Sequence, residues 1–488
     1  MTIEHGKTVE ILKWFEAVNQ IPRCSKNEKQ IGQWLMNWAN DNGLEGKQDN
    51  IGNVTIKVPA SPGYEDSPTV VIQGHQDMVC EKAKDSKHNF STDPIKLVYD
   101  GEWLRADHTT LGADNGIAIA MGLTAALDKN LAHPPLELLF TVDEETALTG
   151  AFALEPGFVE GRLLLNLDSE DEGVLTIGCA GGMKSVHTLP LDYRPVPAGT
   201  IPVCLSARGM AGGHSADIHH EKANALKVLV RTLYEMQAGV DLRLADIKGG
   251  TVDNAVPRFA EAVLYIPGEK LETAETILGQ MEKIFQLEFK NTDPGLKLSL
   301  APLKGKDIPR AAEAIEPGGT GKVIDFLLAI PHGIWAVSTE GEFVHLVETS
   351  NNLASLKIKD KQLRVITSQR SPISSRLDAV TRQIEAVVRL AGGETKNSGR
   401  YPGWAADTAS PLLEKCIAVY ENLFGVKPKV ETTHGGLECG VIGTRYQGMD
   451  MISIGPTIRE PHSPEERIHI GSIGKVWDFF EALLRELK

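Results

Sequence analysis

Five short segments of the chain concentrate histidine and carboxylate side chains. The first, GHQD at 74–77, ends an apolar run. Because side chains at i and i+2 of an extended chain share a face, His75 and Asp77 can point the same way. A histidine that binds a metal commonly has its other ring nitrogen oriented by a carboxylate, and Asp77 would suit that role. Taken alone, the pattern fits an ordinary surface loop equally well.

The second and third segments add acidic residues in contexts that favour a ligand. LGADNG at 111–116 flanks Asp114 with glycines, which let the backbone approach a ligand closely, although an aspartate here also suits a plain helix N-cap. TVDEET at 141–146 sets three carboxylates in succession after an apolar run. Near a core these charges repel each other and need a cation, so one of Glu144 and Glu145 would bind metal while the other moves protons. A solvated turn is the alternative.

The last two segments complete a set of oxygen and imidazole donors. LDSED at 167–171 again follows an apolar run, and EPHSPEER at 460–467 lies in a proline-bounded loop near the C-terminus. Mixed histidine and carboxylate ligation suits zinc, manganese or cobalt. The segments contain no cysteine, which argues against a structural zinc site. Together the five segments predict a metal centre with a chemical role.

The elements that must position these residues alternate between strand and helix. Apolar runs at 68–78, 136–142 and 162–167 read as strands, and the small apolar residues of 113–127 read as a helix. This alternation predicts an α/β sheet. Before it come a helix near 8–19 and a second helix, which we expect to open with a capping box from Ser25 to Glu28.

The texture of the sequence changes near residue 187, where LPLDYRPVPAGTIPV carries four prolines. Expected strands at 201–207 and 258–266 and an expected helix at 222–236 indicate an α+β domain, and the glycine-rich loop at 391–402 marks its end. We therefore expect a catalytic domain made from residues 1–186 and 396–488, interrupted by an inserted domain of residues 187–395.

Composition limits the partners and the location of the protein. The chain has 488 residues and a net charge of −15, so it repels phosphate backbones and nucleic acid is not expected as a partner. Six cysteines without a C-x-x-C spacing read as free thiols of a reducing compartment. The N-terminus lacks an apolar secretory region, and no apolar run approaches the ~20 residues that span a bilayer. These features predict a cytoplasmic protein that does not bind membranes.

As an ordered set, GHQDMV, GADNG, DEET, NLDSED, GGHSADIH and EPHSPEER resemble the di-zinc metallopeptidase family of carnosinases, aminoacylases and glutamate carboxypeptidases, over almost the whole chain. The resemblance implies an α/β fold with a zinc-peptidase-like catalytic domain, a mixed central sheet and an inserted α+β lid domain. It also implies two divalent metal ions per chain, zinc first, with cobalt or manganese as alternatives. Five positions match the family's ligands: His75 and Asp168 for one ion, Glu145 and His462 for the other, and Asp114 for both.

Further roles follow from the same resemblance. Asp77 would orient His75, and Glu144 would be the general base. In the inserted domain His214, in GGHSADIH, resembles the histidine that reaches the scissile carbonyl, although nearby His219 and His220 keep that choice open. Three other positions resemble substrate-holding residues: Asn254, Arg370, whose guanidinium would pair with a peptide carboxylate, and Gly435 in a loop lining the site.

The implied activity is hydrolysis of dipeptides with broad specificity, including Xaa-His substrates such as carnosine, in a homodimer that takes a small peptide substrate. An aminoacylase or a carboxypeptidase of the same family is the alternative enzyme. A catalytically inactive binding protein on this fold is the alternative from another class, and loss of a ligand or of the base would signal it; the sequence keeps all of them. The long insert resembles enlarged lids that supply the lid histidine to their own chain.

Overall fold

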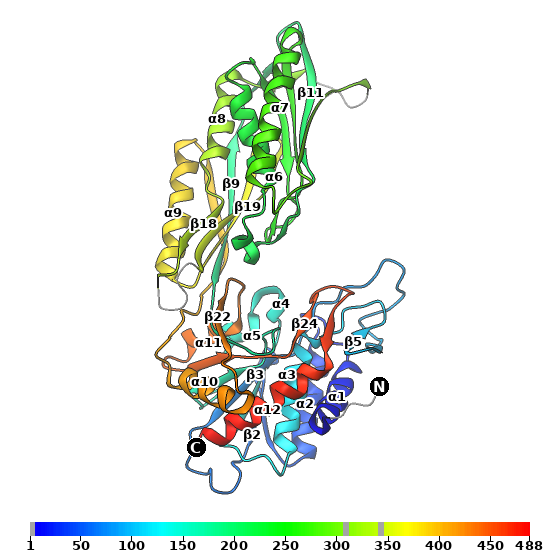
Figure 1. Ribbon diagram of the computed structural model, residues 1–488, viewed down its shortest axis with the longest axis vertical. Coiled ribbons are helices and arrows are strands. Elements are labelled where there is room, and N and C mark those ends of the chain that lie inside the picture. Colours follow the sequence, from blue (N-terminus) through cyan, green and yellow to red (C-terminus); the bar gives the residue numbers. More distant parts are fainter. Residues whose placement is uncertain (1–4, 306–311, 340–345) are drawn as a thin grey trace. The chain divides into compact units, whose positions relative to one another are not determined.

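The computed structural model describes residues 5–305, 312–339 and 346–488 and divides the chain into two compact units (Figure 1). Unit 1 consists of Met1–Cys179 and Gly403–Lys488, and unit 2 consists of Ala180–Pro402. The limits expected from sequence texture, 187 and 395, fall inside strands β9 (Gly181–Pro190) and β21 (Glu394–Tyr401). These strands pair with each other in unit 2, so the proline-rich stretch, which includes β10 (Tyr193–Pro195) and the start of β11 (Thr200–Arg208), lies within that unit rather than at its border.

Unit 1 is built on a mixed sheet whose central strands are parallel. Its strands, in spatial order, are β1 (Glu45–Gln48), β2 (Val54–Val58), β6 (Leu136–Thr141), β3 (Val70–His75), β7 (Leu163–Asn166), β23 (Asp450–Ser453), β8 (Val174–Cys179) and β22 (Lys429–Thr433). Strands β6, β3 and β7, which form from the three predicted apolar runs, lie side by side and parallel. Their carboxyl ends therefore meet at one edge of the sheet, where sites form in α/β folds.

Helices of unit 1 pack against this sheet and against each other. They are α1 (Gly6–Asn19), α2 (Lys29–Asp41), α3 (Ala113–Leu127), α4 (Glu144–Ala147), α5 (Thr149–Ala153), α10 (Pro411–Phe424), α11 (Glu438–Arg445) and α12 (Ile470–Glu486). Helix α3, with the bounds expected from its small apolar residues, is buried almost throughout and packs on β3. Gly74 permits this approach, because a Cβ there would lie 2.4 Å from the Cβ of Ala118.

A smaller antiparallel sheet in unit 1 joins two distant parts of the chain (Figure 1). Its strands are β24 (Ile458–Arg459), β25 (Arg467–His469), β5 (Trp103–Ala106) and β4 (Leu97–Asp100). Strand β25 pairs with β5, with Arg467 opposite Arg105. This pairing brings the loop before β25, which contains His462, towards the segment after β5, which contains Asp114.

Unit 2 is a large antiparallel sheet with helices packed on it, in agreement with the expected α+β insert. The sheet runs β16 (Lys297–Pro302), β11 (Thr200–Arg208), β15 (Ala260–Pro267), β13 (Arg243–Gly249), β19 (Val347–Lys359), β20 (Gln362–Ser371), β9 and β21, with β18 (Gly333–Val337) on β19. Short pairs are β10 (Tyr193–Pro195) with β17 (Glu313–Ile315) and β12 (Gly213–His214) with β14 (Ala255–Val256). The helices are α6 (Ala225–Met236), α7 (Leu271–Glu288), α8 (Pro317–Ala329) and α9 (Ser374–Leu390), with 3₁₀ turns η1 (Ser215–His220) and η2 (Gly268–Lys270).

The expected capping box of the second helix is wrong. Helix α2 begins at Lys29, and its N-cap Glu28 makes no side-chain capping hydrogen bond. Instead, Oε1 of Glu28 accepts the backbone N–H groups of Lys26 at 2.7 Å and Asp143 at 3.0 Å. The Ser25 side chain hydrogen-bonds Asp77. Asp143 and Asp77, both from the edge of the sheet, thus bind the two residues of the expected local motif.

The cysteines are not all free thiols, contrary to the sequence expectation. Cys24 and Cys80 form a disulfide, with their Cα atoms 5.7 Å apart. The free cysteines are Cys179, Cys204, Cys416 and Cys439. The paired residues meet because the N–H of Ser25 donates to the carbonyl of Met78, a contact without a sequence signal. The cysteine content therefore no longer supports a reducing compartment. Within the described ranges, no helix has the length and apolar character needed to cross a bilayer.

Candidate metal centre

Three neighbouring parallel strands carry predicted ligands to one edge of the unit 1 sheet. His75 is the last residue of β3, and Asp168 lies two residues beyond the end of β7. Glu144 and Glu145 open helix α4, directly after β6 and a short turn. Residues that lie far apart in the sequence are therefore delivered to the same place by the strand order β6-β3-β7.

Asp114 lies at the centre of the site because its two carboxylate oxygens face different partners. Its Oδ1 lies 3.0 Å from Nε2 of His75, and its Oδ2 lies 3.0 Å from Nε2 of His462. The same His75 nitrogen is 3.5 Å from Oδ1 of Asp168, and the same His462 nitrogen is 3.0 Å from Oε2 of Glu145. The five predicted ligands thus separate into two sets of donor atoms that share Asp114.

Carboxylates dominate the electrostatics of both histidines. Burial lowers the pKa of His75, but Asp168 and Asp114 outweigh burial and raise this pKa well above its ordinary value. Burial likewise opposes charge on His462, yet hydrogen bonds with Asp114 and Glu145 raise its pKa to about 11. The surrounding acids therefore favour positive charge, from protons or from metal ions, at the two imidazoles. Bound cations would replace those protons, since metal binding to such donors releases them.

The negative charges of Glu145 and Asp168 are not fully balanced by nearby positive charge or hydrogen bonds. Burial, and then the charge of Asp114, raise the pKa of Glu145. Burial also raises the pKa of Asp168, with Asp114 adding to the effect against the opposing charge of His75. The buried Oε1 of Glu145 finds no hydrogen-bond partner among the described residues, a costly state for a carboxylate oxygen. Ligand atoms of His75, Asp114 and Glu145 lie within 4.8 Å of one another, so these residues fit a metal ion.

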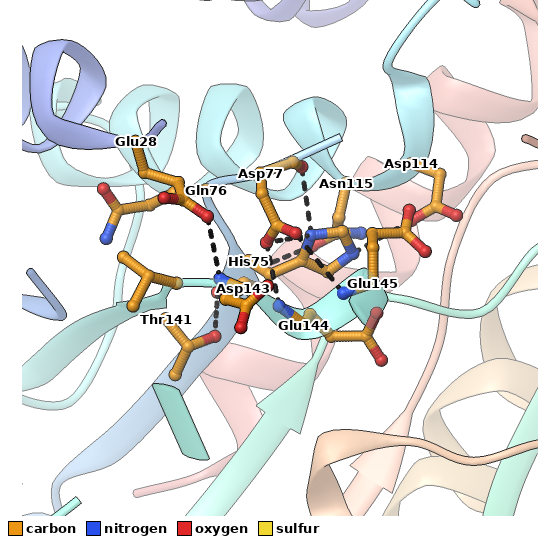
Figure 2. A network of polar contacts seen from close by, with 12 residues as sticks. Glu28, His75, Gln76, Asp77, Asp114, Asn115, Thr141, Asp143, Glu144 and Glu145 are labelled. Atoms are coloured by element: carbon orange, nitrogen blue, oxygen red, sulfur yellow. Dashed lines mark hydrogen bonds and ion pairs between the residues drawn. The ribbon is translucent and has the colours of Figure 1, made fainter. Parts of the chain in front are cut away.

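Asp77 supports both a ligand and the turn that carries the two glutamates. Its Oδ1 lies 3.3 Å from Nδ1 of His75, and its backbone carbonyl lies 3.1 Å from the same nitrogen. Its two carboxylate oxygens accept the N–H of Glu144 at 3.0 Å and of Glu145 at 3.3 Å (Figure 2). The Asp77 carboxylate therefore fixes the imidazole ring of His75 and the backbone of Glu144 and Glu145. Carboxylates behind metal-binding histidines commonly orient the ring in this way.

Glu144 differs from its neighbour Glu145 in position and surroundings. In Figure 2 its carboxylate lies apart from those of Asp114 and Glu145. Burial, together with the charges of Asp168 and Glu145, raises the pKa of Glu144 well above its ordinary value, against the opposing charge of His75. A carboxylate with a raised pKa is suited to take up a proton near neutral pH.

A second group of acids lies behind the site but is already satisfied. Glu28, Asp77 and Asp143 also hold carboxylate oxygens within 4.8 Å of one another. Asp143 accepts the hydroxyls of Thr146 and Thr149, while the other two accept backbone N–H groups. These bonds occupy the group in supporting the turn before α4.

Glu438 is a buried residue of the site that the sequence analysis missed. Its Oε2 accepts hydrogen bonds from Nε2 of Gln73 at 2.6 Å and from the Thr141 hydroxyl at 2.5 Å. Gln73 in turn accepts Nδ2 of Asn166 at 2.6 Å. This network ties β6, β3 and β7 together beneath the ligands, and burial raises the pKa of Glu438 to about 7. The nearest sequence signal was the glycine pair before it, where Gly435 donates its N–H to the Thr433 hydroxyl at 3.1 Å.

Arg23 is a second buried residue that no local pattern indicates. Its guanidinium donates to the carbonyls of Gln76 at 3.1 Å, Asp77 at 3.0 Å and Gly112 at 2.5 Å. Burial lowers its pKa to about 10, against the opposing charges of Glu466 and Asp77. The side chain thus connects the segment after His75 with the glycine turn before Asp114.

In unit 2, Ser215 lies next to the predicted catalytic His214 in the chain and contacts both predicted substrate residues of this unit. The N–H of Ser215, the residue after His214, donates to the carbonyl of Asn254 at 2.7 Å. The Ser215 hydroxyl accepts Nε of the buried Arg370 at 3.3 Å. His214 itself is exposed and pairs with Ala255 across β12 and β14. The alternative, His219, lies in η1, but its side chain is outside the described part.

Comparison with known proteins gives close and extensive matches. The chain is 38% identical to the cytosol non-specific dipeptidase of Escherichia coli K12 over 97% of this chain and 96% of that one. The structure is similar to that of aminoacylhistidine dipeptidase from Vibrio alginolyticus, with a TM-score of 0.88 and 37% identity over 98% and 96% of the two chains. These matches confirm the family resemblance found in the sequence.

More distant matches concern the fold alone. The structure of aminopeptidase PepT from Bacillus cereus has a TM-score of 0.56 and 15% identity, over 98% of both chains. Residues 211–293, within unit 2, match the model of a peptidase dimerisation domain. The expected fold class, an α/β unit with a mixed sheet and an inserted α+β unit, is confirmed by these similarities and by the strand order.

Proposed function

The chain belongs to the family of the cytosol non-specific and aminoacylhistidine dipeptidases, and we propose that it hydrolyses dipeptides at a centre of two divalent metal ions. The observation that carries the proposal is the position of Asp114. Its two oxygens lie 3.0 Å from two different histidines, each of which contacts one further carboxylate. A carboxylate shared in this way is the arrangement that a bridged pair of ions requires.

The contacts on the two sides of Asp114 assign the proposed ligands to two ions. His75 and Asp168 would hold one ion, His462 and Glu145 would hold the other, and Asp114 would contact both. The mixture of imidazole and carboxylate donors suits zinc, with cobalt or manganese as alternatives. The raised pKa of both histidines supports the assignment, because the site gathers more negative charge than the chain itself neutralises.

The remaining residues of unit 1 move protons and hold geometry. When bound, a pair of divalent ions polarises a peptide carbonyl and makes water acidic enough to lose a proton near neutral pH. Glu144 would accept that proton as the water oxygen adds to the carbonyl carbon of the peptide. It would return the proton to the amine nitrogen as the C–N bond breaks, acting first as a general base and then as a general acid. Asp77 holds the His75 ring and the backbone of Glu144 in place throughout. The loop at Gly435 would line the site, as the family resemblance implies.

Unit 2 supplies substrate contacts in this proposal, on the strength of the family resemblance. His214 would stabilise the charge that develops on the carbonyl oxygen, and Asn254 and Arg370 would hold the substrate, with Arg370 pairing with its terminal carboxylate. Support from unit 2 itself is that Ser215, the residue after His214, contacts both Asn254 and Arg370. We further propose a homodimer, supported by the match to a dimerisation domain, and a cytoplasmic location, supported by the name of the E. coli relative.

A substrate panel tests the proposal. Purified protein is supplied with dipeptides, including carnosine and other Xaa-His compounds, with tripeptides, and with N-acyl amino acids, each with and without added zinc. We expect metal-dependent release of amino acids from several dipeptides and little from the other two classes. A preference for N-acyl amino acids would make the protein an aminoacylase instead. Absence of hydrolysis in the metal-loaded protein would reject an enzymatic role.

A further inference from the structure

Glu466 is a buried carboxylate that accepts four backbone N–H groups from a segment more than three hundred residues away in the chain. Its Oε2 accepts the N–H of Leu111 at 2.8 Å and of Gly112 at 3.0 Å. Its Oε1 accepts the N–H of Ala113 at 2.8 Å and of Asp114 at 3.3 Å. The side chain is 2% exposed, so no solvent replaces these bonds.

The four amides lie just before and at the start of helix α3, where Asp114 and Asn115 have non-helical backbone angles. These N–H groups therefore have no regular helical partner and need acceptors from elsewhere. Gly112, the N-cap, has no side chain and cannot supply an acceptor. Gly112 also has φ 69°, and a Cβ there would lie 2.4 Å from Nη2 of Arg23. The segment thus depends on distant side chains for its hydrogen bonds.

Arg23 binds the same segment through a backbone carbonyl, whereas Glu466 binds it through backbone N–H groups. It donates to the carbonyl of Gly112, while Glu466 accepts the N–H of that residue. A buried cation and a buried anion therefore act on the backbone of one glycine, two residues before Asp114. Their opposite charges also favour one another, since Glu466 raises the pKa of Arg23 against burial.

Glu466 is anchored to the loop that carries His462. The N–H of Glu466 donates to the carbonyl of Ser463 at 3.0 Å, and the Ser463 hydroxyl donates to the carbonyl of Glu460 at 2.8 Å. The next residue, Arg467, begins β25 and pairs with β5. The loop between Glu460 and Glu466 is therefore closed on itself, with His462 inside it.

From this geometry we infer that Glu466 is a positioning residue that sets the place of the Asp114 carboxylate relative to His462. It connects the segment of the shared ligand with the loop of a ligand of one donor set, and it does so through backbone N–H groups rather than through a ligand side chain. The inference rests on the proposed two-metal function. Its consequence is specific: the donor set of His462 and Glu145 should depend on Glu466 more than the set of His75 and Asp168.

The test compares Glu466→Gln with Glu465→Gln, which removes the same charge from the adjacent, exposed residue. Metal-free protein is titrated with Co²⁺, and the visible absorption spectrum reports each equivalent bound. A glutamine offers one acceptor oxygen, so two of the four N–H groups lose their partner. We expect one of the two Co²⁺ equivalents to bind about 10- to 100-fold more weakly in Glu466→Gln, with the other nearly unchanged. The control should match the wild-type protein.

A second variant and a second measurement guard against misfolding. Glu466→Asp keeps the charge but shortens the reach, and it should weaken the same equivalent by a smaller factor. In the wild-type protein, Co²⁺ binding should slow deuterium exchange at the amides of Leu111 to Asp114 and in the loop 460–466 together. The inference would be overturned if both variants bound two Co²⁺ equivalents with wild-type affinity. It would also be overturned if Co²⁺ slowed deuterium exchange in only one of the two segments.

The outcome is separable from that of the proposed function. Wild-type protein that binds two Co²⁺ ions and hydrolyses no dipeptide would reject the proposed activity while leaving the role of Glu466 measurable. Normal hydrolysis by wild type with unaltered metal binding in Glu466→Gln would reject the role of Glu466 alone. A kcat of Glu466→Gln that recovers at high metal concentration would further support positioning, because a catalytic loss would persist.

Discussion

Two histidines, one in each unit, are equally buried and have opposite electrostatics. His75 in unit 1 and His187 in unit 2 are each 1% exposed. Carboxylates raise the pKa of His75 well above its ordinary value despite burial, whereas burial lowers the pKa of His187 to about 4. The ring nitrogens of His187 lie 2.9 Å from the hydroxyls of Thr395 and Thr367, which are uncharged.

The difference shows that burial alone does not mark a metal ligand. In unit 1 the edge of the sheet collects acids around an imidazole, and the surplus negative charge requires a cation. In unit 2 the same residue type lies in a sheet covered by an apolar core and stays neutral. The predictions below test each side of this contrast, beginning with the largest expected effect.

The largest effect should come from separating the two adjacent glutamates of unit 1. Glu144→Gln should retain both metal ions and lose about 10²- to 10⁴-fold in kcat, because an amide cannot take up the proton. Glu145→Gln should instead lose metal. Elemental analysis of both variants beside steady-state rates distinguishes them. Metal loss in Glu144→Gln with normal content in Glu145→Gln would mean that the two roles are exchanged.

The second largest loss of kcat should come from removing His214 in unit 2. His214→Ala should lower kcat by about 10²- to 10³-fold without changing metal content, the usual cost of removing one donor to a developing oxyanion. The exposed His220→Ala is the matched control. The source of the histidine is tested by mixing His214→Ala with Glu144→Gln under conditions of subunit exchange. Donation within one chain predicts no recovery, and substantial recovery would show that the histidine crosses between chains.

The third effect concerns the buried guanidinium of unit 2. If Arg370 pairs with the terminal carboxylate, Ala-His-amide should be cleaved about 10- to 100-fold more slowly than Ala-His, because a charge-assisted hydrogen bond is lost. Arg370→Met should abolish this discrimination, and Arg364→Met, an exposed arginine on the same strand, should preserve it. Equal rates on the two substrates in the wild-type protein would remove Arg370 from this role.

The smallest effect should appear in the stability of unit 2 at low pH. The folded pKa of His187, about 4, lies below its ordinary value of 6.5. The unfolded chain therefore binds the proton first, and stability present above pH 6.5 is lost as the pH falls towards 4. At about pH 5 this linkage amounts to about 2 kcal/mol. The variant His187→Gln keeps a hydrogen-bond donor and an acceptor but does not titrate. In urea unfolding, its free energy of unfolding should therefore fall by about 2 kcal/mol less than that of wild type between neutral pH and about pH 5. Identical pH profiles would contradict the neutral state of His187.

The sequence predicted the parts of the site that local patterns encode. Four predicted residues lie at or just after the ends of apolar runs that become parallel strands, namely His75, Glu144, Glu145 and Asp168. Their position at the strand ends was enough to predict that they lie close together. Helix α3 was predicted with its observed bounds, because its small apolar residues pack on β3. Glu144 and Glu145 could not be distinguished by pattern and took their roles from the family resemblance.

What the sequence could not predict depends on contacts between distant segments. Glu466 stands four residues after His462 in a motif that was noted, yet its four partners lie in another part of the chain. Arg23 and the Cys24–Cys80 disulfide are products of the same tertiary approach. The proline content near residue 187 does not reveal the pairing of β9 with β21, which places Ala180–Pro402 in one compact unit.

The most direct test of the central claim is the metal stoichiometry of the purified protein. Metal-free chain is dialysed to equilibrium against increasing Zn²⁺, and bound metal is measured by mass spectrometry alongside hydrolysis of a dipeptide. A centre bridged by Asp114 predicts two ions per chain in wild type, with activity that a chelator abolishes, and fewer than two in Asp114→Ala. A preparation that is fully active without metal, or an Asp114→Ala variant that binds two ions as tightly as wild type, would contradict the account.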